Sequence, residues 1–186
     1  MNGTAKKREI DGQVLHIFDG LFNADLVRLV FETLQRQSFR LADYDTMETA
    51  DVKHWKVEFE LDAFAANPVL RMWHDRIVST ARACFAERRV ELQRIHCNSH
   101  LYGDLQHAHV DLTPGITALY FANTDWHDDW HGETIFYDRA GEPHTAVAPR
   151  PGRVLVFPAD VVHRGGVPSR KCFSARLSVA FKFQNE

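Results

Sequence analysis

The stretch FSARLSVAFKF, residues 173–183, alternates so regularly that it predicts a β-strand with two different faces. Its apolar face carries Phe173, Ala175, Leu177, Val179, Phe181 and Phe183. Its other face carries Ser174, Arg176, Ser178, Ala180 and Lys182. Large apolar side chains in such a run are expected to be covered by a second layer of structure, and helices are the candidates. Arg176 is then expected to point to the opposite side, into the interior of a β structure.

The rest of the chain divides into a mixed first half and a strand-rich second half. From residue 89 onwards, short apolar runs are broken by Gly, Pro and Asp, which is typical of a β-sandwich or barrel. Before that point the apolar spacing predicts strands and helices, with strands at 14–18 and 54–62 and helices at 23–37 and 68–89. Asn23 and the Asn67-Pro68 pair are expected to begin the two helices.

Length and composition fit one domain. The chain has 186 residues, 45% of them hydrophobic, and a formal net charge of −3. That balance gives no basic surface for nucleic acid, and no apolar run reaches the roughly 18 residues of a membrane span. The three cysteines form no CxxC pair, so we expect a cytoplasmic protein with free thiols. We therefore expect a single domain over residues 1–186, with a helical support region at 1–88 and a β core at 89–186 that carries the metal site.

The short stretch HAHVD, residues 107–111, is the main candidate for that metal site. On a strand, residues two apart share a face and lie about 6.5–7 Å apart. Two overlapping pairs satisfy this spacing, His107 with His109 and His109 with Asp111. His163, which follows an apolar run and a Pro-Ala-Asp turn, is the candidate third ligand. Two imidazoles and one carboxylate on one side of an ion are typical of non-haem Fe(II) oxygenases, and zinc is the second choice.

Residues from about Asn98 to Phe183 resemble the Fe(II)/2-oxoglutarate-dependent dioxygenases, specifically their prolyl 4-hydroxylase-like branch. The stretches that carry the resemblance are LYGDLQHAHVD, ITALYFANTDW, HGETIFYD, PRPGRVLVFPADVVHRGG and ARLSVAFKF, in that order. The fold that the resemblance implies is mainly β with flanking helices: a double-stranded β-helix, or jelly-roll and cupin-like barrel, packed against the N-terminal helices. The residues before about 88 carry no motif that can be assigned.

The resemblance also decides between the two overlapping pairs. In that family the pair is His-x-Asp, so His109, Asp111 and His163 are implied as the metal ligands and the catalytic centre. His107 is left over, and because it shares the face of His109 we expect it either to line the entrance or to bond to a neighbouring residue, where it supports the ligands or contacts substrate. Arg176 matches the basic residue that holds the distal carboxylate of 2-oxoglutarate, where a planar guanidinium gives a strong and orienting contact.

Three further residues are implied as parts of the co-substrate pocket. Tyr102 and Thr117 match pocket positions of the family, and Ser178 shares the face of Arg176 and is expected to add a hydroxyl. One departure stands at Phe121, where hypoxia-type prolyl hydroxylases carry a tyrosine. The spacing from His163 to Arg176 is also longer than in those enzymes, which makes Arg164 and Arg170 secondary candidates for the role of Arg176.

The resemblance implies an enzyme that uses Fe(II) and 2-oxoglutarate, with ascorbate as an optional reductant, and that releases succinate and CO2. Because the short chain offers no evident second domain for protein recognition, we expect it to hydroxylate an unactivated C–H bond of a small molecule or amino-acid derivative. Asp111 favours hydroxylation, since related halogenases carry a small residue there. The alternatives are a peptidyl-prolyl hydroxylase of the same family, and a cupin-type metal enzyme or binding module that does not use 2-oxoglutarate.

The sequence also gives expectations for the partners of the chain and for the loop near the candidate site. We expect a monomer or homodimer, with no nucleic-acid and no membrane partner. The loop at 123–133, rich in Trp, His and Asp, either grips the substrate or is a structural loop held by Trp126 and Trp130.

Overall fold

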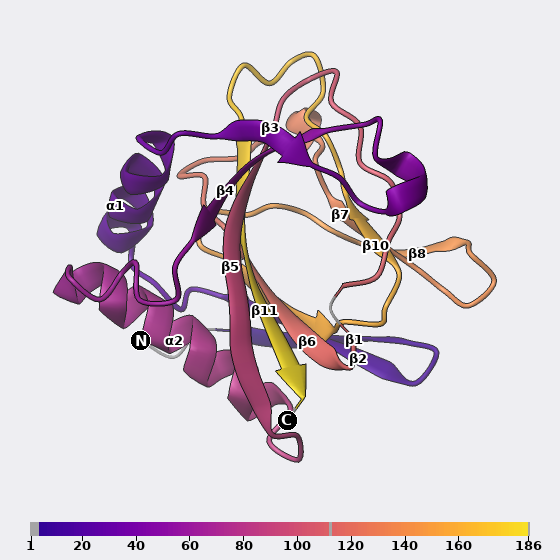
Figure 1. Cartoon of the computed structure of the whole chain (residues 1–186), viewed down its shortest axis with the longest axis horizontal. Coiled ribbons are helices and arrows are strands. Elements are labelled where there is room, and N and C mark those ends of the chain that lie inside the picture. Colours follow the sequence, from indigo (N-terminus) through magenta and orange to yellow (C-terminus); the bar gives the residue numbers. More distant parts are fainter. Residues whose placement is uncertain (1–3, 112, 186) are drawn as a thin grey trace.

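The computed structural model describes residues 4–111 and 113–185, and antiparallel strands account for more of these residues than helices do (Figure 1). The first half of the chain contains β1 (Thr4–Ile10), β2 (Gln13–Asp19), α1 (Ala24–Gln35), β3 (Arg40–Asp43), the 3-10 turn η1 (Met47–Thr49), β4 (His54–Phe59) and α2 (Pro68–Cys84). The second half contains β5 (Val90–His100), β6 (Gly115–Phe121), η2 (Asp128–Trp130), β7 (Thr134–Tyr137), β8 (Pro143–Val147), β9 (Val154–Pro158), β10 (His163–Gly165) and β11 (Arg176–Asn185).

The strands form two sheets. The larger sheet has eight strands in the order β1-β2-β9-β6-β11-β5-β4-β3, and the smaller has three in the order β10-β7-β8. Strand β11 lies within the larger sheet between β5 and β6 and pairs antiparallel with both. The first half of the chain therefore supplies four strands to this sheet as well as two helices, so residues 1–88 are more than the helical support region that we expected.

The strand expected at 173–183 begins later than the alternation indicated. It starts at Arg176, and Phe173 lies before it with 96% of its surface exposed. The expectation that Phe173 belongs to the covered face is therefore wrong. From Leu177 onwards the pattern holds, because Val179, Phe181 and Phe183 are fully buried.

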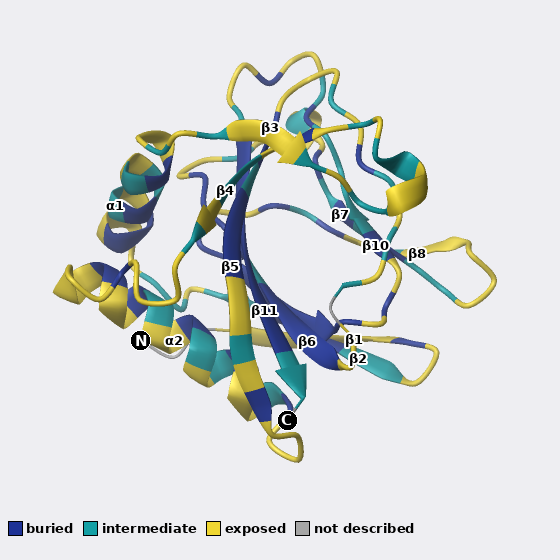
Figure 2. Ribbon diagram, viewed as in Figure 1, coloured by how far each residue is buried: buried dark blue, intermediate teal, exposed yellow. Residues whose placement is uncertain are grey.

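The helices cover that apolar face of the larger sheet (Figures 1 and 2). Helix α2 begins at Pro68, after Asn67, whose side-chain oxygen accepts from the backbone N–H of Val69 and Leu70. Trp73 of α2 packs edge-on against Phe181 at a ring separation of 5.5 Å. Asn23 caps α1 in the same way, by accepting from the backbone N–H of Leu26 at 2.8 Å. None of the described helices is long and apolar enough to cross a membrane.

The opposite face of the larger sheet looks toward the smaller sheet, and the strand register decides which side chains meet there. Arg176 pairs with His100 at one end of the β11–β5 ladder, and Lys182 pairs with Arg94 near the other. Lys182 also pairs with Thr117 of β6. Because side chains alternate along a strand, the polar positions of β5, β6 and β11 all point into the space between the sheets.

Candidate metal centre and its cavity

A cavity of about 560 Å³ lies between the two sheets. Alternate residues of β5 and β11 line one wall, and Thr134 of β7 and His163 of β10 line the facing wall. The lining is unusually polar for a protein interior, because it includes histidines, arginine, lysine and aspartates. A volume of this size is within the range of small-molecule sites.

Three side chains in this cavity are close enough to hold one metal ion. Ligand atoms of His109, Asp111 and His163 all lie within 4.8 Å of one another. Nε2 of His109 is 3.6 Å from Oδ1 of Asp111, and Nε2 of His163 is 3.5 Å from Oδ2 of the same carboxylate. These are the three residues that the sequence selected. The structure thus brings together Asp111 and His163, which are 52 positions apart in the chain.

Backbone hydrogen bonds hold these segments against each other. The N–H of His109 donates to the carbonyl of His163, and the N–H of His163 donates to the carbonyl of His109, both at 2.9 Å. The N–H of Asp111 donates to the carbonyl of Ala159 at 2.8 Å. This bridge replaces the regular strand that we expected over 107–111, and it is sufficient to fix the two imidazoles beside each other.

The same environment sets the tautomer of both imidazoles. Nδ1 of His109 lies 3.0 Å from the carbonyl of His107, and Nδ1 of His163 lies 2.9 Å from the carbonyl of Val161. A carbonyl only accepts, so in each ring Nδ1 must carry the proton. The lone pair of a neutral ring is then on Nε2, which is the atom that faces Asp111. Both histidines are therefore prepared to bind a metal through Nε2.

The carboxylate between them is ionised. Burial raises the pKa of Asp111, but the charges of Lys182 and His163 and the hydrogen bond from His109 outweigh it and hold the pKa well below its usual range. Thr117 also donates to Oδ2 of Asp111 at 2.6 Å. Burial lowers the pKa of His163 to about 4, so this ring stays neutral near pH 7. Burial lowers the pKa of His109, but the hydrogen bond to Asp111 and the charge of that carboxylate outweigh it and raise the pKa above its usual value. A metal ion bound at Nε2 would take the place of the proton that His109 shares with Asp111. With that proton displaced, two imidazoles and a carboxylate form a donor set that fits Fe(II) and leaves other coordination positions open.

A fourth side chain, Asp45, lies behind this centre. Its Oδ1 is 3.3 Å from Nδ1 of His109, and its Oδ2 accepts from the backbone N–H of His107 at 2.5 Å. Nε2 of His54 is 3.0 Å from the same Oδ2. Burial raises the pKa of Asp45, but His54 and the His107 amide together lower it below the usual value. Sequence reasoning missed Asp45, because no local pattern signals a contact between segments so far apart.

His107 bonds to its neighbours, which is one of the two places that we expected for it. Its ring is not part of the cavity lining, and the group of described residues that could hold a metal does not include it. Its backbone does take part, since the carbonyl accepts from His109 and the amide donates to Asp45. His107 therefore supports the metal centre through its main chain.

Arg176 is the second marked feature of the cavity. Its Nε donates to the carbonyl of Gly132 at 2.7 Å, and its two terminal nitrogens donate to Ser178 Oγ at 3.1 Å and Thr134 Oγ1 at 3.0 Å. The side chain is 1% exposed, and none of the ion pairs between described residues includes it. Burial lowers the pKa of Arg176 to about 10, which leaves it charged near pH 7. A buried guanidinium without an acidic partner fits an anionic ligand, because the missing counter-charge then comes from that ligand.

The loop at 123–133 contacts Arg176 through the carbonyl of Gly132. Gly132 has a φ of +84°, and a Cβ at this position would come within 3.1 Å of both Arg176 Cδ and the Trp126 ring. Any larger residue at this position would therefore be strained, and glycine favours the close approach of the loop carbonyl to the guanidinium. Trp126 packs edge-on against Trp130 at 5.4 Å and donates its Nε1–H to the carbonyl of His131 at 2.7 Å. These contacts favour the structural reading of the loop at 123–133.

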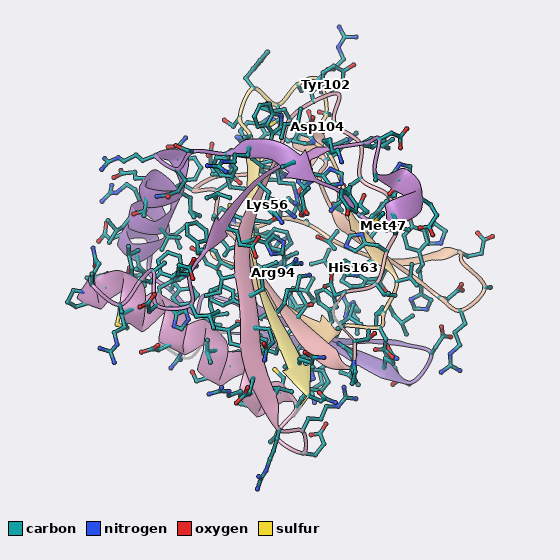
Figure 3. The ribbon with its side chains drawn as sticks, in the orientation of Figure 1. Met47, Lys56, Arg94, Tyr102, Asp104 and His163 are labelled. Atoms are coloured by element: carbon teal, nitrogen blue, oxygen red, sulfur yellow. The ribbon has the colours of Figure 1, made fainter. Side chains whose placement is uncertain are left out.

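The remaining predicted pocket residues divide into two groups. Thr117 and Ser178 line the cavity and contact Asp111 and Arg176 respectively. Tyr102 is 64% exposed, does not line the cavity, and lies at the edge of the molecule in Figure 3, away from His163. Its assignment to the co-substrate pocket finds no support in this arrangement. Arg164 and Arg170 are also absent from the lining, so of the three arginines considered for the co-substrate carboxylate Arg176 alone lines the cavity.

Lys182 is the second cavity residue that sequence reasoning left without a role. Its Nζ forms an ion pair with Oδ2 of Asp111 and lies 3.5 Å from Thr117 Oγ1. A signal was present in the sequence, since Lys182 shares the polar face of the strand with Arg176. What the sequence did not reveal is that the β6 register places this ammonium directly beside the metal-site carboxylate.

Comparisons with known proteins agree with this geometry. The family model described as the 2OG-Fe(II) oxygenase superfamily matches residues 95–184. Among solved structures, a prolyl-4-hydroxylase from Pseudomonas putida aligns with 18% identity and a TM-score of 0.68, covering 91% of each chain. No curated protein matches the sequence.

Two further structures come from proteins with other descriptions. The α-ketoglutarate-dependent epimerase SnoN from nogalamycin biosynthesis aligns with 16% identity and a TM-score of 0.64, covering 91% of this chain and 77% of that one. HygX from Streptomyces hygroscopicus, solved with nickel and 2-oxoglutarate bound, aligns with 15% identity and a TM-score of 0.62, covering 91% and 82%. At these identities the likeness shows a shared fold.

Proposed function

Because the chain belongs to the 2OG-Fe(II) oxygenase superfamily through residues 95–184 and is a 2-oxoglutarate-dependent oxygenase, we propose that it hydroxylates an unactivated C–H bond of a small molecule or amino-acid derivative. The observation that carries the proposal is the combination of two groups in one cavity. These are the cluster of His109, Asp111 and His163, and the buried, unpaired guanidinium of Arg176. A cupin-type hydrolase or binding module would need the cluster but not the arginine.

In this proposal each residue has a defined task. His109 and His163 bind Fe(II) through Nε2, and Asp111 binds it through a carboxylate oxygen. When bound, the iron with 2-oxoglutarate and O2 supplies the oxidising power that converts C–H to C–OH, with succinate and CO2 as co-products. Arg176 pairs with the distal carboxylate of 2-oxoglutarate through its guanidinium, and Ser178 and Thr134 orient that guanidinium.

The protein also controls water and geometry around the reacting groups. Phe136 and Phe157 pack against the ring of His163, at ring separations of 5.7 and 4.8 Å, and close that side of the cavity. Such apolar cover limits solvent access and fixes the imidazole, both of which favour a defined metal site. We also propose that the two sheets together form the double-stranded β-helix of the superfamily, with the helices as its outer layer.

The substrate class rests on the shape of the site. The metal cluster lies inside a cavity between two sheets, and its lining offers charged and hydrogen-bonding groups in place of an extended apolar groove. This arrangement fits a small polar molecule. A peptidyl-prolyl hydroxylase is the second candidate, favoured by the likeness to a structure described as a prolyl-4-hydroxylase. Cytoplasmic location, an ascorbate requirement and the oligomeric state stay predictions.

The substrate class can be tested by mass spectrometry. The enzyme with Fe(II), 2-oxoglutarate and O2 is incubated with either a small-metabolite extract or a tryptic peptide extract of the same cells. The proposal predicts that species gaining one oxygen arise in the metabolite extract and depend on added 2-oxoglutarate. Oxygen gain on proline residues in the peptide extract alone would favour the second candidate.

A further inference from the structure

The cavity contains a second basic group, separate from Arg176. Lys182 and Arg94 lie directly opposite each other on β11 and β5, and both line the cavity. Six positions separate Arg176 from Lys182 on β11, which puts their Cα atoms about 20 Å apart along the strand. One anionic group therefore cannot occupy both sites. Figure 3 shows Arg94 on the wall of the cavity formed by β5, with Lys56 of β4 nearby.

Arg94 has no acidic partner among the residues that the structure describes. The carboxylates in its neighbourhood are already engaged, since Asp43 and Glu58 lie 3.0 and 3.4 Å from Lys56. Asp111 is engaged by Lys182. Two like charges opposite each other on neighbouring strands destabilise a sheet. An anion bound between Arg94 and Lys182 would remove this repulsion.

A buried imidazole completes the group. His96 lies between Arg94 and Asn98 on the same face of β5, opposite Ala180, and is 4% exposed. Among the residues that the structure describes, neither Nδ1 of His96 nor Oδ1 of Asn98 has a hydrogen-bond partner, although both residues line the cavity. A buried polar atom without a hydrogen bond lowers the stability of the fold. A ligand that forms a hydrogen bond to it removes this cost, which adds to the free energy of binding. Ala180 leaves room in front of His96 for such a ligand.

We infer that Arg94, Lys182 and His96 bind a carboxylate of the substrate, so that the substrate is a small organic acid. The inference rests on the proposed function, because it takes the Arg176 site as the place of 2-oxoglutarate. Arg94 offers a planar pair of donors that matches a carboxylate. Lys182 has three donors, of which Asp111 and Thr117 use two, and one remains for the ligand. Because Lys182 contacts Asp111, a substrate held there lies beside the metal centre.

Thermal unfolding of the loaded protein tests this inference. The full chain is saturated with Mn(II) and 2-oxoglutarate without O2, which fills the Arg176 site and prevents turnover. An equimolar pool of small monocarboxylic acids is then compared with the matching pool of their primary amides. We expect the acids to raise the melting temperature further and the amides to leave it unchanged, since a bound ligand stabilises the folded state.

Arg94→Gln should abolish the shift by the acids, because losing one charge-assisted contact weakens binding by about tenfold or more. The shift by Mn(II) with 2-oxoglutarate should stay unchanged in this variant. Arg89→Gln is the matched control, since Arg89 is exposed near the start of β5 and outside the cavity. Arg94 is exposed at the rim, so its replacement does not endanger folding.

The outcomes separate this inference from the proposed function. An equal shift by acids and amides, no shift by the acids, or an undiminished shift in Arg94→Gln would overturn the carboxylate site while leaving the Fe(II) and 2-oxoglutarate assignment intact. If Mn(II) with 2-oxoglutarate itself failed to stabilise the protein, the proposed function would fail and this inference with it.

Discussion

Oδ1 of Asp45 lies 3.3 Å from Nδ1 of His109, so a residue of the N-terminal half supports a side chain of the metal centre. The carboxylate also accepts from the amide of His107, the residue whose carbonyl bonds to the same Nδ1. Acid–histidine–metal arrangements of this kind fix the tautomer and orientation of the ligand ring. The segment between β3 and β4 thereby contributes to the candidate metal site.

Asp45→Asn should therefore weaken metal binding by about 10- to 100-fold, as is usual when such a supporting carboxylate is lost. The measurement is titration of the purified protein with Co(II) or Fe(II) without O2. Asp51→Asn is the control, since Asp51 is exposed and lies in the same connection. A purely structural role for Asp45 would lower the melting temperature of the metal-free protein while leaving the metal dissociation constant as it was.

The three ligands should be individually indispensable. We expect His109→Ala, Asp111→Ala and His163→Ala each to abolish metal binding and turnover. His107→Ala should bind metal almost normally, because His107 contributes through its backbone. Metal content after dialysis and 2-oxoglutarate turnover check both expectations. Loss of metal in His107→Ala together with retention in Asp111→Ala would show that the other overlapping pair is the real one.

Arg176 should determine the affinity for 2-oxoglutarate. Truncating one partner of a buried charge pair costs on the order of 2–5 kcal/mol, so Arg176→Ala should raise the apparent constant for 2-oxoglutarate roughly 30-fold or more. Metal affinity should change little, and Arg176→Lys should recover only part of the loss. Arg170→Ala is the control on the exposed loop before β11. A larger effect in the control than in Arg176→Ala would contradict the pocket assignment.

Stability should fall in mild acid because of His100. Burial lowers the pKa of this ring to about 3, and neither ring nitrogen has a hydrogen-bond partner in the described part of the chain. At pH values between the unfolded-state pKa of about 6.5 and the folded-state pKa, His100 binds a proton in the unfolded chain but not in the folded chain. The free energy of unfolding should therefore decrease as pH falls through this window, by up to about 1.4 kcal/mol per pH unit for this one group.

Urea unfolding of the metal-free protein at several pH values between about 6.5 and 4 measures that slope. His100→Asn removes the titrating ring and should flatten it, whereas the exposed His144→Asn should not. Identical slopes in the wild type and in His100→Asn would show that the ring is not buried as the structure has it.

Local patterns in the sequence located the candidate ligands, and the resemblance to the oxygenase family chose between the two overlapping pairs. The His-x-Asp pair is a local motif, and His163 directly follows a predicted strand. In the structure the two lie close together, as we expected. The inward direction of Arg176 also followed from alternation alone. These features depend on residues within one or two strands, where the period of the backbone limits the possible arrangements.

Contacts between segments far apart in the chain could not be predicted from local sequence patterns. Asp45 contacts His109 from a segment 64 positions earlier, and Lys182, whose β6 partner is Thr117, contacts Asp111. Phe173 shows the converse error, since the alternation extends upstream of Arg176, where the strand begins, and hydrophobicity alone does not mark that beginning. Tyr102 was assigned by position in a motif, and its loop carries the side chain outward.

Succinate formation from 2-oxoglutarate tests the central claim most directly. The purified protein is given Fe(II), 2-oxoglutarate and O2, with and without a small-metabolite extract, and succinate is quantified. The account predicts that succinate forms, that it requires both Fe(II) and O2, that the extract increases it, and that Asp111→Ala abolishes it. Absence of succinate under every condition in a protein shown to bind Fe(II), or equal succinate formation by Asp111→Ala, would contradict the account.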